Sequence, residues 1–308
     1  MTDALPDFVA PMLAQIGEPF DSDEHLFEIK WDGTRCLTFL DGGAQAPRLR
    51  NRRDNDLAMR YPELAFLADL PAGAVLDGEI VVLRDGQADF PALLSREQAR
   101  TPERAAQLAG TTPATYAVFD QLYAGHRSIM NRPLLERRAS LRELVEGCGD
   151  ARLVFSDGVR GGGIAYFDEV CGLGIEGVVA KRIDSRYLSG RRTGAWLKLK
   201  PVQRLHCVIL GFVPDGPRDV KSLIIGSDPG DGLRCVGKVG SGLTDDLRRR
   251  LRTELEPRVV GRPLVPCPGM SAAKSRWVEP GLYCVVSFVE ITARGNLRAP
   301  VFIELLTD

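Results

Sequence analysis

Residues 30–35, Lys-Trp-Asp-Gly-Thr-Arg, combine a lysine, a carboxylate and an arginine between two apolar runs. Lys30, with Asp32 two residues further on, has the composition of a nucleophile beside its charge partners. The apolar runs 26–29 and 36–40 predict two short strands of a hairpin, with Asp32-Gly33 as its turn. A hairpin whose charged tip is only solvated has the same pattern. Other segments must therefore decide between a reactive lysine and a surface turn.

The overall composition excludes several classes of protein. The chain of 308 residues is long enough for two domains, and 44% hydrophobic with 26% charged residues is ordinary for a globular protein. No apolar run approaches the roughly 20 residues of a membrane span, and no signal pattern precedes the first strand. The 7 cysteines are scattered without a C-x-x-C pair, which argues against a disulfide framework and a zinc site. We expect a cytoplasmic protein without a membrane partner.

Charge is nearly balanced overall, with 40 basic and 41 acidic residues, but it is unevenly distributed. The segment 181–204 holds eight basic residues and a single acidic one, Asp184, which suits a polyanion or a solvated basic face. Lys198 and Lys200 alternate there with leucines on a predicted strand. They are therefore expected to share one face and a common target.

The order of predicted elements indicates an α+β domain of mostly antiparallel sheets, followed by a small β-barrel. Five short strands and one helix, at 244–255, follow residue 201 and are typical of an OB-fold. We therefore place an α+β domain at 1–201 and an OB-fold at 202–308. In the first domain we expect strands at 26–30, 35–40, 74–83, 115–120, 176–181 and 195–200, and helices at 91–109, 133–146 and 164–172.

Four further segments carry charged or aromatic residues on predicted strands. They are Asp-Gly-Glu at 77–79, Tyr-Ala-Val-Phe-Asp at 116–120, Glu-Gly-Val-Val-Ala-Lys at 176–181 and Trp-Leu-Lys-Leu-Lys at 196–200. Each alone fits a surface ion pair or a core aromatic. Together, and in this order after Lys30, they resemble the motifs of covalent nucleotidyltransferases. These are the ATP-dependent DNA ligases and their RNA-ligase and mRNA-capping relatives.

The closer similarity is to bacterial ATP-dependent DNA ligases, either stand-alone or forming the ligase part of end-joining enzymes. It covers residues from about 10 to 306, nearly the whole chain. Supporting segments are Arg50-Asn51, Arg-Tyr-Pro-Glu-Leu at 60–64, Arg-Pro-Leu-Leu-Glu-Arg-Arg at 132–138, Tyr-Leu-Ser-Gly-Arg-Arg at 187–192 and Val-Gly-Lys-Val-Gly-Ser-Gly at 236–242.

The resemblance implies a nucleotidyltransferase (adenylation) domain before the OB-fold, and a role for each motif. Lys30 is the implied AMP acceptor, and neighbouring cations would favour its reactive neutral form. Asp32 would orient it or act in the DNA steps. The implied nucleotide and metal contacts are Lys198 and Lys200 on phosphates, Arg35 and Arg50 on ribose or phosphates, Phe119 and Val179 on either face of adenine, the backbone of Glu28 and Ile29 at the adenine edge, Glu176 on a metal, and Glu79 on metal or ribose.

The implied reaction has three steps: AMP passes from ATP to the lysine, then to a 5′-phosphate at a nick, and is released when the 3′-hydroxyl attacks. Hard oxygen ligands suit Mg²⁺, with Mn²⁺ as an alternative. The OB-fold would close and reorient about residues 200–202. The expected partners are nicked duplex DNA and end-binding or gap-filling repair proteins, with the chain itself a monomer. Candidate DNA contacts are Arg191, Arg192, Lys238 and the cluster Arg248-Arg249-Arg250, the last of which also fits a solvated helix face.

Two positions depart from the family pattern. Leu306 stands where an arginine that orients pyrophosphate is usual, and Leu49 stands where a serine is usual. Both bear on self-adenylation, and three alternatives stay open: this step is slow, Arg294 or Arg298 substitutes for the missing arginine, or the terminus is shortened. The alternatives are an RNA ligase or capping-type nucleotidyltransferase, and a weakly active nucleic-acid-binding relative.

Overall fold

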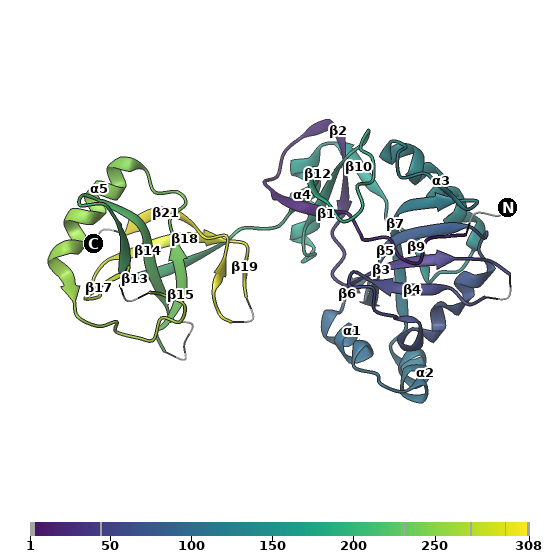
Figure 1. Ribbon diagram of the computed structural model, residues 1–308, viewed down its shortest axis with the longest axis horizontal. Helices are drawn as coiled ribbons and strands as arrows, with labels where there is room; N and C mark the ends of the chain where they lie inside the picture. The colour runs from purple at the N-terminus through teal and green to yellow at the C-terminus, as the bar shows by residue number, and fades with distance from the viewer. Residues whose placement is uncertain are drawn as a thin grey trace. The chain divides into compact units, whose positions relative to one another are not determined.

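The computed structural model describes residues 4–43, 45–228, 230, 232–271, 273–292 and 294–306. The chain divides into two compact units, Met1–Lys200 and Pro201–Asp308 (Figure 1). The boundary expected from the sequence, after residue 201, lies one residue further along. Within the part of the chain that the structure describes, no helix has the length and apolar character needed to cross a bilayer.

Two largely antiparallel sheets form the first unit. The five-stranded sheet has the order β1-β12-β11-β2-β10, in which only β1 and β12 run parallel. Its strands are β1 (Leu13–Gly17), β2 (Ser22–Ile29), β10 (Gly158–Gly161), β11 (Val178–Arg182) and β12 (Arg192–Leu199).

The seven-stranded sheet has the order β4-β3-β5-β7-β8, with β6 paired to β5 and β9 to β7. Its strands are β3 (Thr34–Leu40), β4 (Arg48–Asn51), β5 (Ala74–Arg84), β6 (Gln87–Ala88), β7 (Ala114–Ala124), β8 (Arg127–Ser128) and β9 (Leu153–Phe155). The helices are η1 (Ala58–Arg60), η2 (Pro62–Asp69), α1 (Phe90–Glu97), α2 (Pro102–Thr111), α3 (Leu134–Cys148) and α4 (Gly163–Gly172). Helix α3 packs on β7 and β9, and α4 packs on β2.

The predicted hairpin around Asp32-Gly33 is wrong, because β2 and β3 belong to different sheets. β2 pairs with β11 and β10, whereas β3 pairs with β4 and β5. Residues 30–33 instead cross from one sheet to the other. A Cβ at Gly33 would lie 2.2 Å from the carbonyl oxygen of Ile80, so glycine lets the chain pass this close to β5. The crossing brings Lys30 to the space between the sheets.

The single helix predicted over 91–109 is two helices. Thr101 lies between them with extended backbone, as expected for a residue that precedes a proline. Its hydroxyl accepts a hydrogen bond from the backbone N–H of Arg104 at 3.3 Å, so it caps the second helix. The Thr101-Pro102 pair is therefore a signal in the sequence for this break, which the prediction of one continuous helix did not use.

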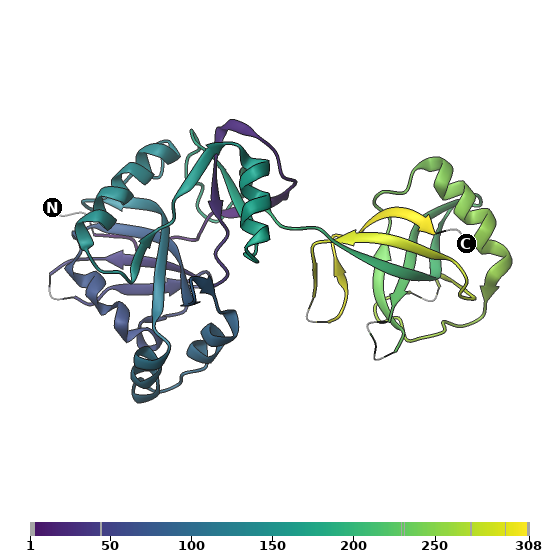
Figure 2. The same cartoon turned by 180° about the vertical axis from the view of Figure 1, so that it is seen from behind.

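The second unit is a curled sheet built around β13 (Gln203–Asp215), which pairs with three strands (Figure 2). Helix α5 (Asp245–Leu255) packs against β14 and adds Leu251 and Leu255 to the core. The other elements are β14 (Asp219–Ser227), β15 (Arg234–Val239), η3 (Glu256–Arg258), β16 (Val259–Val260), β17 (Arg276–Val278), β18 (Tyr283–Phe288), β19 (Glu290–Ile291), β20 (Leu297–Arg298) and β21 (Val301–Leu306).

The arginine cluster on α5 is engaged within the unit. The guanidinium of Arg248 donates to four carbonyl oxygens, those of Val220, Lys221, Gly240 and Leu243, at 2.7, 2.8, 2.8 and 3.2 Å. Arg249 pairs with Asp246, and Arg250 with Glu254. Arg248 thus ties α5 to the strand ends, which does not support the predicted DNA contact.

Replacing Arg248 by alanine is expected to lower the free energy of unfolding by about 2–3 kcal/mol, because four carbonyl groups lose a charged donor. Arg249→Ala is the matched control and is expected to change stability by less than about 0.5 kcal/mol, as for exposed ion pairs. Urea unfolding of the full chain measures both. Equal stability of the two variants would contradict this assignment.

Candidate active site

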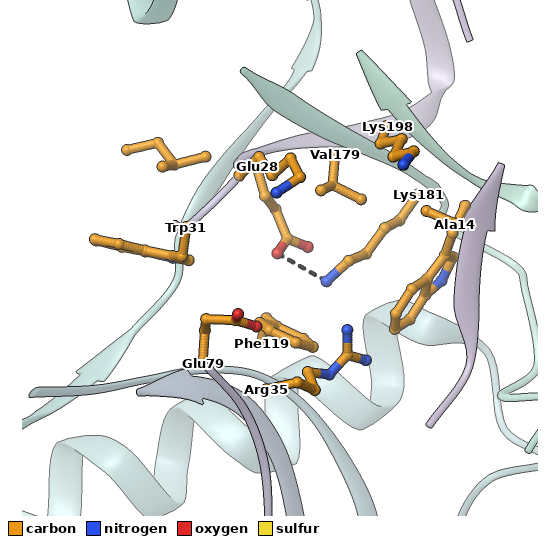
Figure 3. A pocket seen from close by; sticks show the side chains of 12 residues that line it. Ala14, Glu28, Trp31, Arg35, Glu79, Phe119, Val179, Lys181 and Lys198 are labelled. Atoms are coloured by element: carbon orange, nitrogen blue, oxygen red, sulfur yellow. Dashed lines mark hydrogen bonds and ion pairs between the residues drawn. The ribbon is translucent and has the colours of Figure 1, made fainter. Parts of the chain in front are cut away.

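The cavity between the two sheets collects most of the predicted site residues. It has a volume of about 130 Å³, and both sheets contribute to its walls (Figure 3). Val179 lies on one side of it and Phe119 on the other. The lining residues are Ala14, Glu28, Ile29, Lys30, Trp31, Arg35, Glu79, Phe119, Val179, Lys181, Trp196 and Lys198.

Glu176 joins two of the predicted catalytic lysines. Its carboxylate is paired with Lys30 Nζ through Oε2, and with Lys200 Nζ at 2.5 Å through Oε1. The backbone N–H of Lys30 also donates to the carbonyl of Gly177 at 2.9 Å, which anchors the crossing segment to the start of β11. One carboxylate thus holds two ammonium groups. In this arrangement Lys30 must leave Glu176, or give it a proton, before it can act as a nucleophile.

Glu79 and Asp32 are the carboxylates with raised pKa values near Lys30. Burial raises the pKa of Glu79 to about 7, although Arg35 and Lys30 oppose the shift. Its carboxylate makes no hydrogen bond or ion pair with any residue that the structure describes. Burial, followed by the charge of Glu176, raises the pKa of Asp32. Asp32, Lys30 and Glu176 line an adjoining cavity of about 110 Å³.

Arg35 is fixed by a buried network. Asp77, with no exposed surface, accepts from Arg35 Nε and Nη2 at 2.5 and 2.6 Å and from the Tyr187 hydroxyl at 2.6 Å. That hydroxyl accepts in turn from the backbone N–H of Met12 at 2.9 Å. The guanidinium carbon of Arg35 then lies 4.5 Å from the centroid of the Phe119 ring. Asp77 and Tyr187 therefore position Arg35 at the cavity.

Removing the Tyr187 hydroxyl should weaken nucleotide binding more than the fold. In Tyr187→Phe, Asp77 loses one donor and Met12 N–H loses its acceptor, at a cost of about 1–2 kcal/mol. We expect a several-fold higher KM for ATP in self-adenylation, with a smaller change in kcat. Tyr123→Phe, also next to this core, is the matched control. An unchanged KM in Tyr187→Phe would contradict the positioning role.

A second buried network forms the back of the cavity. Glu28 accepts from Lys181 at 2.8 Å (Figure 3). It also accepts from Arg138 at 3.0 Å. Lys181 Nζ lies 4.1 Å from the centroid of Phe119, and burial lowers the pKa of Lys181 to about 8. Arg138 also donates to the carbonyl oxygens of Phe119 and Ser156 at 3.0 and 2.7 Å. Arg138 thus links β2 of one sheet to β7 of the other.

Lys181 and Trp196 are cavity residues that the sequence reasoning missed. Both residues belong to quoted motifs, at 176–181 and 196–200, but neither is assigned a role there. Lys181 lies two residues after Val179 on one strand, and alternate residues of a strand face the same side. This spacing was the signal that Lys181 faces the cavity together with Val179.

The backbone of Glu28 is enclosed in its sheet, so it does not support the expected contact with an adenine edge. Glu28 lies opposite Val179 of β11 and Gly158 of β10, and an inner strand uses its backbone groups in the ladder. The Glu28 side chain, by contrast, lines the cavity. Ile29 lines it as well and lies opposite Val178.

Arg50 is not brought to this cavity. It lies opposite Leu37 on β4, pairs with Asp54 at 3.9 Å, and lines a separate hollow together with His126. β4 is the end strand of its sheet, and the N-terminal residues Leu5 and Asp7 border the same hollow. The register therefore does not support Arg50 as a ribose or phosphate contact of the cavity.

The predicted DNA contacts are exposed, apart from Arg248 of the α5 cluster, which is half-buried. Arg191 and Arg192 are exposed where β12 begins, and the Arg192 side chain donates to the carbonyl of Ala14. Lys238 is exposed on β15 of the second unit. Arg294 is also exposed, whereas Arg298 pairs with Glu290 at 2.5 Å. Leu306 ends β21.

A lysine between a cavity lined by both sheets and a carboxylate, on an α+β domain followed by a curled sheet, is the arrangement expected of a covalent nucleotidyltransferase. Two family models match the chain, the "ATP dependent DNA ligase domain" over 10–200 and the "ATP dependent DNA ligase C terminal region" over 216–308. The chain therefore belongs to the ATP-dependent DNA ligases. The resemblance and the fold expected from the sequence are confirmed.

Similar proteins include both end-joining and stand-alone ligases. Multifunctional non-homologous end joining protein LigD of Pseudomonas aeruginosa is 35% identical over 99% of this chain, which spans 36% of that relative. DNA ligase C of Mycobacterium tuberculosis is 36% identical over 82% of this chain and 71% of its own length. The solved ligase domain of M. tuberculosis LigD matches with a TM-score of 0.58 and 33% identity, covering 97% and 95% of the two chains.

Proposed function

We propose that this ligase seals nicks in duplex DNA through a lysyl-AMP intermediate on Lys30, as part of DNA repair. The observation that carries the proposal is the position of Lys30, which lines both the cavity with Phe119 and Val179 and the adjoining cavity with Asp32 and Glu176. One lysine thus borders a space suited to a nucleotide and a second space through which a polynucleotide end can approach.

In the first step, Lys30 Nζ forms a bond to the α-phosphorus of ATP, and the bond from that phosphorus to the pyrophosphate oxygen breaks. Glu176, which pairs with Lys30, takes the proton that the amine must lose. Lys198 and Arg35, at the cavity wall, supply positive charge for the phosphates. Phosphoryl transfer depends mainly on such positioning and charge stabilisation.

The base would stack between Phe119 and Val179. At the back of this space the Glu28 carboxylate offers an acceptor and the Lys181 ammonium a donor. The amino group and ring nitrogen of adenine are a complementary donor and acceptor. In this proposal the side chains of Glu28 and Lys181 contact the adenine edge, a role expected from the sequence for the backbone of Glu28.

The acidic groups fit a magnesium ion, with Mn²⁺ as a substitute. The described residues hold no group of three or more His, Cys, Asp or Glu side chains around one point. Mg²⁺ in nucleotide enzymes is instead held by one or two carboxylates and the substrate phosphates. The unpaired carboxylate of Glu79, with Glu176, meets this need, and the ion would neutralise phosphate charge.

In the later steps AMP moves to the 5′-phosphate at the nick, and the 3′-hydroxyl displaces it, with Asp32 near the reacting groups. Arg191, Arg192 and Lys238 would contact the DNA backbone, so binding should weaken steeply with salt. We further propose a monomer that acts in the cytoplasm, associates with the nucleoid during repair and works beside end-binding or gap-filling proteins.

The test is to incubate the protein and Mg²⁺ with ATP or GTP labelled at the α-phosphate, and to look for label that survives denaturation. Nicked duplex DNA is then added. We expect labelling by ATP and release of the label on nicked DNA with sealing. Labelling by GTP would indicate a capping-type enzyme, transfer only to RNA an RNA ligase, and no labelling a nucleic-acid-binding relative.

A further inference from the structure

A further hollow lies beside the nucleotide cavity, separated from it by the wall that Ile29 and Trp31 form. It has a volume of about 400 Å³ and shares both residues with that cavity. Three aromatic side chains line it, those of Trp31, Phe155 and Tyr166. We call it the aromatic groove. Nothing in the reaction described above uses it.

The walls of the aromatic groove are held in place from behind. The indole Nε1 of Trp31 donates to the hydroxyl of Ser156 at 2.9 Å. Phe155 has the guanidinium carbons of Arg138 and Arg142 at 4.6 and 4.3 Å from its ring centroid. Phe155 is therefore a fixed wall with cationic partners, and Trp31 and Tyr166 are the two other aromatic surfaces of the groove.

Tyr166 adds an unused polar group. Its ring is half-buried, and its hydroxyl has no hydrogen-bond partner among the residues that the structure describes. Burial, with the nearby Glu28 and Asp157 carboxylates, raises the pKa of Tyr166, so the O–H keeps its proton. A donor beside an aromatic wall suits a planar ligand that carries hydrogen-bond acceptors.

We propose that the aromatic groove binds a nucleobase next to the nick that is not paired with the template strand. This inference rests on the proposed function. The reacting phosphate must reach Lys30, and the residues on either side of Lys30 form the shared wall, so the neighbouring nucleotide arrives beside the groove. Aromatic side chains stack with any base, and an unpaired base has free edges for Tyr166. A base paired in the duplex is already stacked and stays outside.

The direct test uses 2-aminopurine at the nucleotide on either side of a nick, opposite a pairing base or opposite an abasic site. Stacking quenches this fluorophore. With the unpaired substrate we expect the wild-type protein to lower the fluorescence, and with the paired substrate we expect no such change. This measurement needs no variant, so it holds even where a substitution harms folding. Unchanged fluorescence with the unpaired substrate would overturn the proposal.

The kinetic test compares Tyr166→Leu with the wild type on the same two substrates. We expect sealing of the unpaired substrate to fall by about tenfold, the size of one lost stacking contact. Self-adenylation and sealing of the paired nick should be unchanged. Tyr283→Leu, at a half-exposed tyrosine of the second unit, is the matched control. An equal loss on both substrates would overturn the proposal. Failure of the wild type to label or seal would instead refute the proposed function.

Discussion

Replacing Lys30 by alanine is expected to reduce formation of the labelled protein–AMP adduct by at least about a thousandfold, as for loss of other catalytic nucleophiles. Among the residues that the structure describes, no other lysine lines both cavities. Lys181 is paired with Glu28, and Lys200 is paired with Glu176. The adduct is measured after denaturation with ATP labelled at the α-phosphate. Label retained by Lys30→Ala would contradict the assignment of the nucleophile.

A control variant and a pre-adenylated substrate distinguish the loss of the nucleophile from a general loss of structure. Lys200→Ala removes the other ammonium on Glu176, and we expect slower labelling without its loss. Nicked DNA that already carries AMP on its 5′-phosphate needs no lysyl-AMP. Lys30→Ala should therefore still seal this substrate. If Lys30→Ala folds normally but does not seal this substrate, Lys30 also acts in the final step.

The linear motifs predicted the family and most strands, because residue order and alternation are local properties of a chain. The strands with which β2 and β3 each pair were not predictable in this way. An Asp-Gly pair between two apolar runs is typical of a hairpin, yet β2 pairs with β11, and that partner lies far along the chain. Which sheet a strand joins depends on such distant partners. The crossing that places Lys30 between the sheets was therefore hidden.

The roles of charged side chains were predictable only where a motif fixed them. Arg50 and Arg248 looked like nucleic-acid or nucleotide contacts from charge alone. The first lies on an end strand beside Asp54, and the second donates to backbone carbonyls that are up to 28 positions away. Lys181 was missed because its meaning depends on Glu28, on another strand. Charge patterns in a sequence do not say whether a side chain meets solvent, carbonyl groups or a carboxylate.

Two adjacent arginines of α3 show how the cavity keeps its shape. Arg137 donates to both carboxylate oxygens of Asp120 at 2.8 Å, and Arg138 pairs with Glu28, with all four side chains buried. Buried ion pairs stabilise a fold little relative to apolar packing, but removal of one partner is costly. Their geometry fixes where Phe119 and Glu28 stand. The two ion pairs of this helix therefore help to fix the shape of the cavity.

Glu79→Gln is expected to stabilise the protein in the absence of nucleotide and metal while it slows self-adenylation by about a hundredfold or more. Burial raises the pKa of Glu79 to about 7, above its value of about 4.3 in an unfolded chain. The protonated carboxyl is thus favoured by the fold, and this contribution is lost as the pH rises through 7. Glutamine keeps the shape and cannot ionise.

The expected signature is a pH-dependent difference in the free energy of unfolding, measured with urea in the presence of EDTA. The free energy of unfolding of Glu79→Gln should exceed that of the wild type by about 2 kcal/mol at pH 8. This is less than the full pKa shift would give, because the side chain borders an open cavity. The difference should shrink as the pH falls toward 5. Glu18→Gln, at an exposed glutamate, should show no such difference. A Glu79→Gln protein less stable than the wild type at pH 8 would mean that the carboxylate stabilises the fold. The buried, unpaired carboxylate would then not be a destabilising group that the protein keeps in order to bind a cation.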